Sequence, residues 1–169
     1  NADDRLNRLR QIMAQENVDL VAIGPGAHMQ WLLGFHPHAD ERPCLLCVSH
    51  NRSAFLMPAL NAEGARANTD LTFYEWDDAA GPSNAIRNLL TDLNVGGKAK
   101  LALDETMRAD FAAVLQEALP QASRQFSAST VGALRMRKDN NEYKCLKRNA
   151  KIADNVMQAA WQALKTGMR

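Results

Sequence analysis

Residues 43–57 read PCLLCVSHNRSAFLM, and this stretch decides what kind of sheet the chain can build. Two apolar runs, PCLLCVS at 43–49 and SAFLM at 53–57, are separated only by the polar turn His-Asn-Arg. A connection this short joins neighbouring strands that run in opposite directions. We therefore predict an antiparallel hairpin of two largely buried strands.

The segments on either side of the hairpin alternate between strand and helix. Before it, an amphipathic helix that starts near Asp3 leads into DLVAIG at 19–24, which has the composition of a buried strand. The order of elements predicts an α/β domain over residues 3–135, with a mixed sheet flanked by helices in three layers. The remaining elements that we expect are helices at 59–68, 83–93 and 106–119 and strands at 71–76, 100–104 and 124–129.

The composition narrows the classes of partner. The chain has 169 residues, of which 46% are apolar, and its 20 basic and 19 acidic side chains leave a formal net charge of +1. This balance gives no electrostatic reason to expect nucleic acid or an anionic membrane as partner. No apolar run approaches the roughly 20 residues that span a bilayer. The odd count of three cysteines argues against a disulfide framework, so we expect a cytoplasmic protein.

The segment from Asp139 onward follows a different pattern. Its apolar residues recur at alternating intervals of three and four, which predicts one long amphipathic helix over 139–166. Either the preceding domain or a following one must cover this apolar stripe, and we expect a following one. The residues of the stripe are Tyr143, Leu146, Ala150, Ala153, Met157, Ala160 and Leu164.

The loop before the hairpin, GFHPHADER at 34–42, carries an unusual number of titratable groups. His36, His38 and Asp40 alternate along it, and imidazole and carboxylate groups are ligands for zinc and other divalent metals. A metal site normally needs ligands from a second segment, and the other histidines show no recognisable ligand spacing. We therefore predict no metal site in this loop.

Arg42 stands at the exit of the loop, directly before Pro43. Proline disfavours helical backbone in the residue that precedes it, so Arg42 is expected to be extended at the mouth of the strand. Its planar guanidinium can bind a carboxylate through two parallel hydrogen bonds. That carboxylate is either internal, from the neighbours of Glu41 or from Asp104, or it belongs to a ligand or a partner subunit. The internal salt bridge is the commoner outcome.

Other motifs offer no complete catalytic arrangement. Cys44 and Cys47 lie within a predicted strand, where positions three apart face opposite sides, so we interpret both as buried apolar residues. The GPG at 24–26 matches no phosphate-binding pattern. Asp77 and Asp78 follow a predicted strand and are interpreted as solvated turn residues. We predict no catalytic residue in this chain.

Three motifs in a fixed order resemble a known family. They are WLLGF at 31–35, ERP at 41–43 and LRMRKDNNEYKCLKRNAKIAD at 134–154. Together they resemble the N-terminal domain of the creatinase/prolidase/aminopeptidase P family, the "pita-bread" metallopeptidases, and most of all Xaa-Pro dipeptidases. The resemblance implies a ribonuclease H-like α/β fold, followed by a long helix that leads into a catalytic domain.

The same resemblance implies a division of labour. In that family a separate catalytic domain binds two divalent metals, commonly manganese, cobalt or zinc, which activate water to hydrolyse a peptide bond. None of its ligand motifs occurs here, so the implied role is non-catalytic, in a parent hydrolase that acts on small peptides. The implied partners are the catalytic domain of the same chain and a second copy in a homodimer.

The resemblance also implies a site. Loops of the N-terminal domain approach the partner subunit's active site and restrict substrate size, and His36, His38 and Arg42 are the expected gating residues, with Trp31 and Phe35 packed beneath. Two alternatives stay open. One is that the chain is the N-terminal domain of a creatinase-like C–N hydrolase. The other is that it is a free-standing module that binds peptides or proteins.

Overall fold

The computed structural model describes residues 1–168, which form two units that meet between Arg135 and Met136. The first unit contains a six-stranded sheet with the order β4-β3-β2-β1-β5-β6. Only β2 runs against its neighbours, so the sheet is mixed, as predicted. The strands are β1 (Leu20–Ile23), β2 (Leu45–Ser49), β3 (Ser53–Pro58), β4 (Thr72–Trp76), β5 (Lys100–Leu103) and β6 (Ser123–Phe126).

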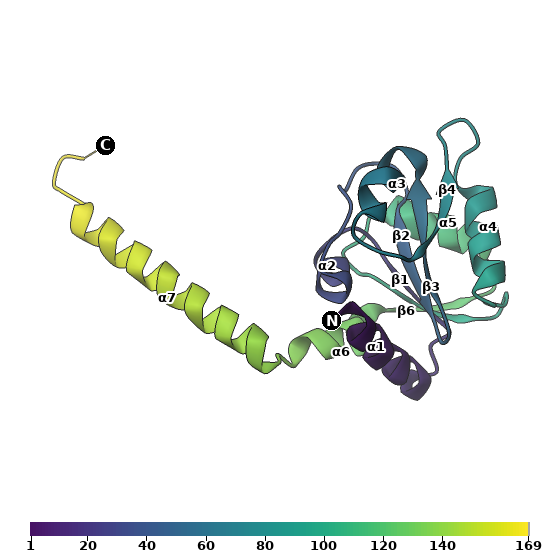
Figure 1. The fold of residues 1–169 in the computed structure, drawn as a ribbon, viewed down its shortest axis with the longest axis horizontal. Helices are drawn as coiled ribbons and strands as arrows, with labels where there is room; N and C mark the ends of the chain where they lie inside the picture. Colours follow the sequence, from purple (N-terminus) through teal and green to yellow (C-terminus); the bar gives the residue numbers. More distant parts are fainter. Residues whose placement is uncertain (169) are drawn as a thin grey trace. The chain divides into compact units, whose positions relative to one another are not determined.

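Helices cover both faces of this sheet and make the predicted three layers (Figure 1). Because side chains alternate across a strand, Leu20 and Ala22 face one apolar core while Val21 and Ile23 face the other. Helices α4 and α5 pack on the first core, and α1, α2, α3 and α6 pack on the second. The helices are α1 (Ala2–Glu16), α2 (Ala27–Leu33), α3 (Ala59–Arg66), α4 (Ser83–Asp92), α5 (Ala109–Ala118), α6 (Val131–Met136) and α7 (Asn140–Ala163).

The predicted hairpin is present as β2 and β3. Its turn is closed by a hydrogen bond from the Ser49 amide to the Arg52 carbonyl, at 2.9 Å. Arg10 of α1 reaches the same turn, where its side chain donates to the Ser49 carbonyl at 3.2 Å and to the Ser53 hydroxyl at 2.8 Å. These bonds fix α1 against the turn between β2 and β3.

Both cysteines of the hairpin region are buried, on opposite faces of the sheet. Burial raises the pKa of the Cys44 and Cys47 thiols to about 12 in each case. The thiolate is the reactive form of cysteine, so these two residues act as packing groups and not as nucleophiles. This agrees with the interpretation of both cysteines as buried apolar residues, although Cys44 lies directly before β2 and not within it.

The end of the first unit differs from the prediction. The strand expected at 124–129 ends at Phe126, and residues 127–129 form a 3₁₀ turn, η1 (Ser127–Ser129). The short helix α6 then follows, which the sequence analysis did not predict. Its six residues are too few to show a helical period, although its buried residues, Val131 and Leu134, lie three apart.

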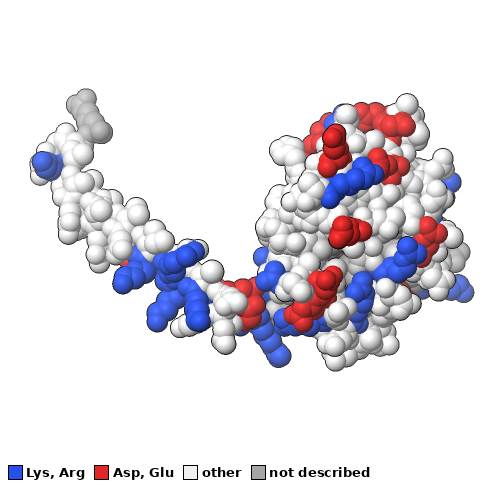
Figure 2. All heavy atoms as spheres, in the orientation of Figure 1, with Lys and Arg blue, Asp and Glu red and all other residues white. Residues whose placement is uncertain are grey.

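The second unit is dominated by the long helix α7, which begins at the N-cap Asp139 as a complete capping box with Glu142. None of its described side chains is buried. Lys144, Lys147, Arg148 and Lys151 recur at helical spacing in its first half, where Figure 2 shows basic atoms gathered. Among residues 1–168, no helix has the length and apolar character needed to cross a bilayer.

Candidate functional site

Polar side chains gather at one edge of the sheet. Strands β1, β3, β4, β5 and β6 share one direction and end at this edge, whereas the antiparallel β2 begins there. The segment that precedes β2 therefore meets the turns that follow the other strands. In α/β sheets, ligands bind in the crevice outside the carboxyl ends of the strands. This edge is the candidate functional site.

Arg42 forms an ion-paired group at this edge, which we call the Arg42 cluster, with Asp40, Glu41 and Asp78. Its guanidinium donates to both carboxylate oxygens of Asp78, with Nε–Oδ1 and Nη2–Oδ2 distances of 3.0 Å. Nη1 also lies 3.3 Å from Glu41, and the Arg42 amide donates to Asp40. The hydrogen bond with Arg42 lowers the pKa of the Asp78 carboxyl and raises the pKa of the arginine.

The internal salt bridge expected for Arg42 is thus present, but one of the acceptors named for it was wrong. Asp104 does not bind Arg42, because its Oδ1 accepts from the amide and the hydroxyl of Thr106, at 2.8 and 2.6 Å. Asp78 is an exposed turn residue, as interpreted, but it also accepts two hydrogen bonds from the Arg42 guanidinium, which the sequence analysis did not predict. Pairing of β3 with β4 brings Asp78 to the edge where Arg42 enters the sheet.

A groove with a volume of about 390 Å³ lies beside the Arg42–Asp78 pair. Its wall is mainly apolar, and Leu60 in it is 75% exposed. Trp76 is buried, and its indole N–H donates to the Pro43 carbonyl at 2.9 Å, which fixes the exit of the loop against β4. The lining residues are Arg42, Pro58, Ala59, Leu60, Trp76, Asp77 and Asp78.

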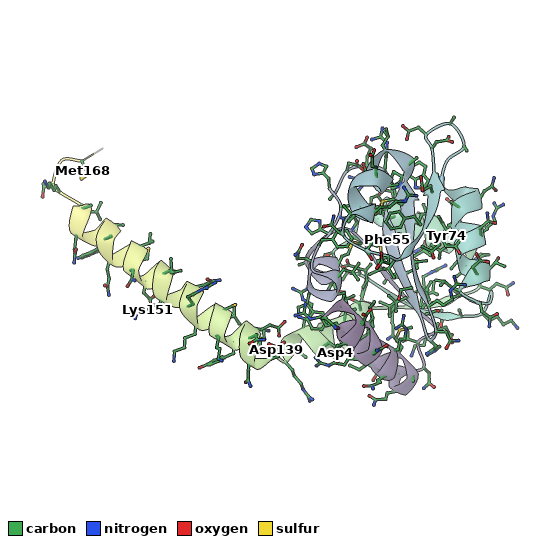
Figure 3. All side chains as sticks on the ribbon, in the orientation of Figure 1. Asp4, Phe55, Tyr74, Asp139, Lys151 and Met168 are labelled. Carbon is green, nitrogen blue, oxygen red and sulfur yellow. The ribbon has the colours of Figure 1, made fainter. Side chains whose placement is uncertain are left out.

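The start of the loop is anchored by the two predicted aromatic residues. The Phe35 ring lies 6.3 Å from Phe55, a fully buried residue of β3 that is labelled in Figure 3. The Trp31 ring lies beneath the Arg5 guanidinium, 4.6 Å away, and Arg5 also donates to the Trp31 carbonyl. Gly34 ends α2 with a φ of 86°, a conformation that favours glycine. Both aromatic rings pack on the second core.

His36 and His38 are exposed between these two anchored ends. The Nδ1 atom of His36 lies 2.8 Å from the Pro37 carbonyl and therefore carries the proton, because a carbonyl only accepts. Asp40 uses Oδ1 for the Arg42 amide. Within residues 1–168, the one group of three possible metal ligands lies elsewhere. The loop thus presents two imidazoles to solvent on a fixed frame.

A second group at the same edge was missed by the sequence analysis, and we call it the His28 cluster. His28, at the start of α2, is 4% exposed. Its Nε2 lies 3.4 Å from Glu105 and 3.9 Å from Asp104, which follow β5. Its Nδ1 lies 2.9 Å from Nη1 of Arg135 in α6. Ser127 donates to Glu105 at 2.7 Å and completes the cluster.

The hydrogen-bond pattern assigns the tautomer of His28. Arginine only donates, so the Nδ1 that faces Arg135 must be an acceptor. The single proton of the neutral ring is therefore on Nε2, directed at Glu105 and Asp104. A metal would need a free lone pair on Nε2, although the possible ligand atoms of these three residues lie within 4.8 Å of one another. The cluster fits a hydrogen-bonded network better than a metal site.

The carboxylates of this cluster are held in different ways. Burial alone would raise the pKa of Glu105, but hydrogen bonds from Ser127, from the Glu105 backbone and from His28 outweigh it and lower the pKa of this carboxyl. Asp104 is 3% exposed, and its Oδ2 has no hydrogen-bond partner among the described residues. Glu105 thus combines specific hydrogen bonds with access to water, its side chain being 38% exposed, whereas Asp104 is shielded from water.

One signal could have located the His28 cluster. The predicted strand at 19–24 ends shortly before His28. The predicted strand at 100–104 ends at Asp104. Parallel neighbouring strands end at the same edge, so their terminal polar residues meet. The sequence does not show that β1 and β5 are neighbours, and Arg135 is 107 residues from His28.

The sequence model of the family described as the Creatinase/Prolidase N-terminal domain matches residues 5–137. No curated protein matches the chain. Among solved structures, a dipeptidase from Pyrococcus horikoshii OT3 is 27% identical with a TM-score of 0.86, over 98% of this chain and 46% of that one.

Two further structures have the same fold. A prolidase from Thermococcus sibiricus is 20% identical with a TM-score of 0.87, over 99% of this chain and 46% of that one. The Creatinase/Prolidase N-terminal domain of an X-Pro dipeptidase from Streptococcus pyogenes is 19% identical with a TM-score of 0.62, over 72% of this chain and 92% of that one. The chain thus spans less than half the length of the dipeptidase and the prolidase.

Proposed function

The chain belongs to the creatinase/prolidase N-terminal domain family, and from this premise we propose that it is the non-catalytic N-terminal domain of a dinuclear-metal Xaa-Pro dipeptidase or aminopeptidase. The observation that carries the proposal is the similarity of 98% of this chain to less than half of a dipeptidase. The rest of such a protein has room for a catalytic domain. Two divalent metals there, manganese, cobalt or zinc, would supply an activated water.

The described residues of this chain do not fit that metal centre. The carboxylates of the Arg42 cluster bind an arginine, and the His28 ring is held by Arg135. We assign this chain a different task, which is to shape the entrance of the active site. A homodimer in which each N-terminal domain approaches the catalytic domain of its partner provides the arrangement for that task.

Loop 36–42 supports this gating role through its construction. Phe35 holds one end against the core, and Arg42 holds the other against Asp78. The histidines between them are exposed, and proline separates them and stiffens the backbone. A preformed loop loses little conformational entropy when a substrate binds. Its imidazoles and its arginine offer donors for the carboxylate of a small peptide.

The cysteines support a cytoplasmic location for the whole protein. Cys44, Cys47 and Cys145 are all free, and Cys145 is exposed. An exposed free thiol persists best in a reducing compartment.

The gating role predicts a change in kinetics without a change in metal content. In the whole protein, His38→Ala should alter kcat/KM for Xaa-Pro dipeptides by about three- to tenfold, the range expected for one hydrogen bond. Steady-state kinetics over dipeptides of different size would be measured together with bound metal. His50→Ala, which changes an exposed histidine in the β2–β3 turn, is the matched control. Unchanged kinetics for every dipeptide would contradict the role of the loop.

A further inference from the structure

The His28 cluster has no part in the proposed gate, yet it connects three elements of the fold. His28 belongs to α2, Asp104 and Glu105 follow β5, and Arg135 lies in the last turn of α6. The His28 side chain is 5% exposed and that of Asp104 is 1% exposed. Interactions here are screened by water much less than those at the surface.

We propose that His28 is a proton-sensitive tie between Arg135 and the two carboxylates. The neutral ring bridges Arg135 to Asp104 and Glu105. The protonated ring binds the carboxylates alone and releases Arg135. In the neutral ring, Nδ1 accepts from Arg135 at 2.9 Å and Nε2–H faces Glu105. A proton added to Nδ1 would point at the N–H of the guanidinium, so this contact cannot persist.

The charges around the ring act in the same direction. The charged groups that face His28 are Arg135 from α6 and Asp104 and Glu105 from the turn after β5. An imidazolium would be repelled by the guanidinium and attracted by the carboxylates. Protonation therefore strengthens one side of the bridge and breaks the other.

The structural consequence is confined to the end of α6. Val131 and Leu134 keep their apolar contacts with the second core at any pH, because neither residue ionises. Loss of the Arg135 contact would loosen only the last turn of the helix. That turn precedes the second unit, so acid would change the mobility of the connection between the two units.

Hydrogen exchange on the full 169-residue chain tests this inference. Exchange of peptides that cover residues 128–138 would be measured by mass spectrometry from pH 8.0 to 5.0 and corrected for intrinsic rates. We expect the corrected rate to rise about two- to tenfold at the acid end, the range that corresponds to loss of one hydrogen bond. Peptides from β1 and β2 provide the internal reference, because both strands are buried.

Two variants separate the tie from general acid effects. His28→Gln supplies an amide oxygen for Arg135 and an amide N–H for Glu105 at every pH, so the acid response should disappear. In Arg135→Gln, the amide can donate to the neutral imidazole and accept from the imidazolium. The hydrogen bond to His28 then persists at every pH, so the rise in exchange at acid pH should also disappear. The matched control, His50→Gln, alters an exposed histidine and should keep the wild-type response.

Three outcomes would overturn the inference. The first is a wild-type chain whose corrected exchange at 128–138 does not change with pH. The second is an acid response that persists in both His28→Gln and Arg135→Gln. The third is stoichiometric binding of zinc by the wild-type chain at pH 7.5, which would show that Nε2 carries a free lone pair.

Discussion

The Arg42 cluster and the His28 cluster lie at the same edge of one sheet, and both join arginine to carboxylates. They differ in their access to water. Asp78 and Glu41 of the Arg42 cluster have side chains 61% and 71% exposed, whereas in the His28 cluster those of His28 and Asp104 are 5% and 1% exposed and, of its two carboxylates, only Glu105, at 38%, reaches water. Exposed ion pairs contribute little to stability, while a buried polar group that loses its partner is costly.

The two clusters are therefore suited to different roles. The Arg42 cluster joins loop 36–42 to the turn after β4, and water can replace any of its contacts. It is suited to holding a preformed loop at the surface of the molecule. The His28 cluster joins α2, the end of β5 and α6, and little water reaches its central imidazole. It is suited to a fixed connection that responds to a proton.

The largest effect is expected from Asp104→Ala in the His28 cluster. This change removes the acceptor of two hydrogen bonds, from the amide and the hydroxyl of Thr106, and empties the buried site of the Asp104 side chain. We expect the free energy of unfolding, measured by urea titration, to fall by about 2–4 kcal/mol.

Asp104→Asn provides the matched control, because its amide oxygen can still accept from Thr106. It should lose less than half as much stability as Asp104→Ala. Equal losses in the two variants would show that the negative charge, and not the Thr106 acceptor, makes the main contribution.

A smaller effect is expected from the pH dependence of Glu105. Its pKa is lower in the folded chain than the ordinary value of 4.5 because of its hydrogen bonds. A carboxyl with a depressed pKa stabilises the fold above that ordinary value, and this stabilisation is lost as the pH falls through the folded pKa. Stability should therefore decrease below about pH 5, and Glu105→Gln should decrease less steeply over the same range.

The exposed Glu63 of α3 gives a control for this measurement. Urea titrations from pH 6 to pH 3 would compare Glu63→Gln with Glu105→Gln. A Glu105→Gln profile that parallels the wild type would mean that the contacts from Ser127 and His28 do not hold the carboxylate in solution.

The layers of the fold could be predicted because local signals determine them. The hairpin at 43–57 shows its antiparallel pairing through a turn too short for any other connection. The long helix shows itself through a repeat that persists over six intervals and through its cap at Asp139. These features need no knowledge of distant residues.

The site could be predicted only where its residues are close in sequence. Loop 36–42 was recognised because its charged groups are adjacent, but Arg42 and Asp78 are 36 positions apart, and His28 and Arg135 are 107 apart. Which acid meets which base depends on the order of the strands in the sheet. Strand β5 pairs with β1 although 76 residues lie between the end of β1 and the start of β5. No local pattern contains that order.

The smallest effect on global stability is expected from Asp78→Asn, which weakens the exposed Arg42 cluster. The bidentate contact with Arg42 is lost, but both groups are hydrated, so the urea midpoint should not change measurably. Hydrogen exchange at residues 40–43 should increase about twofold, because the loop exit loses one of its two attachments and keeps the Trp76–Pro43 bond.

In the wild type, 0.5 M sodium chloride should have a similar local effect, since salt screens exposed charges, and it should add little in the variant. Glu117→Gln, which removes an exposed carboxylate of α5, is the matched control and should leave 40–43 unchanged. A marked drop in the urea midpoint for Asp78→Asn would mean that the two clusters do not differ in kind, and that the loop is as firmly built into the core as His28.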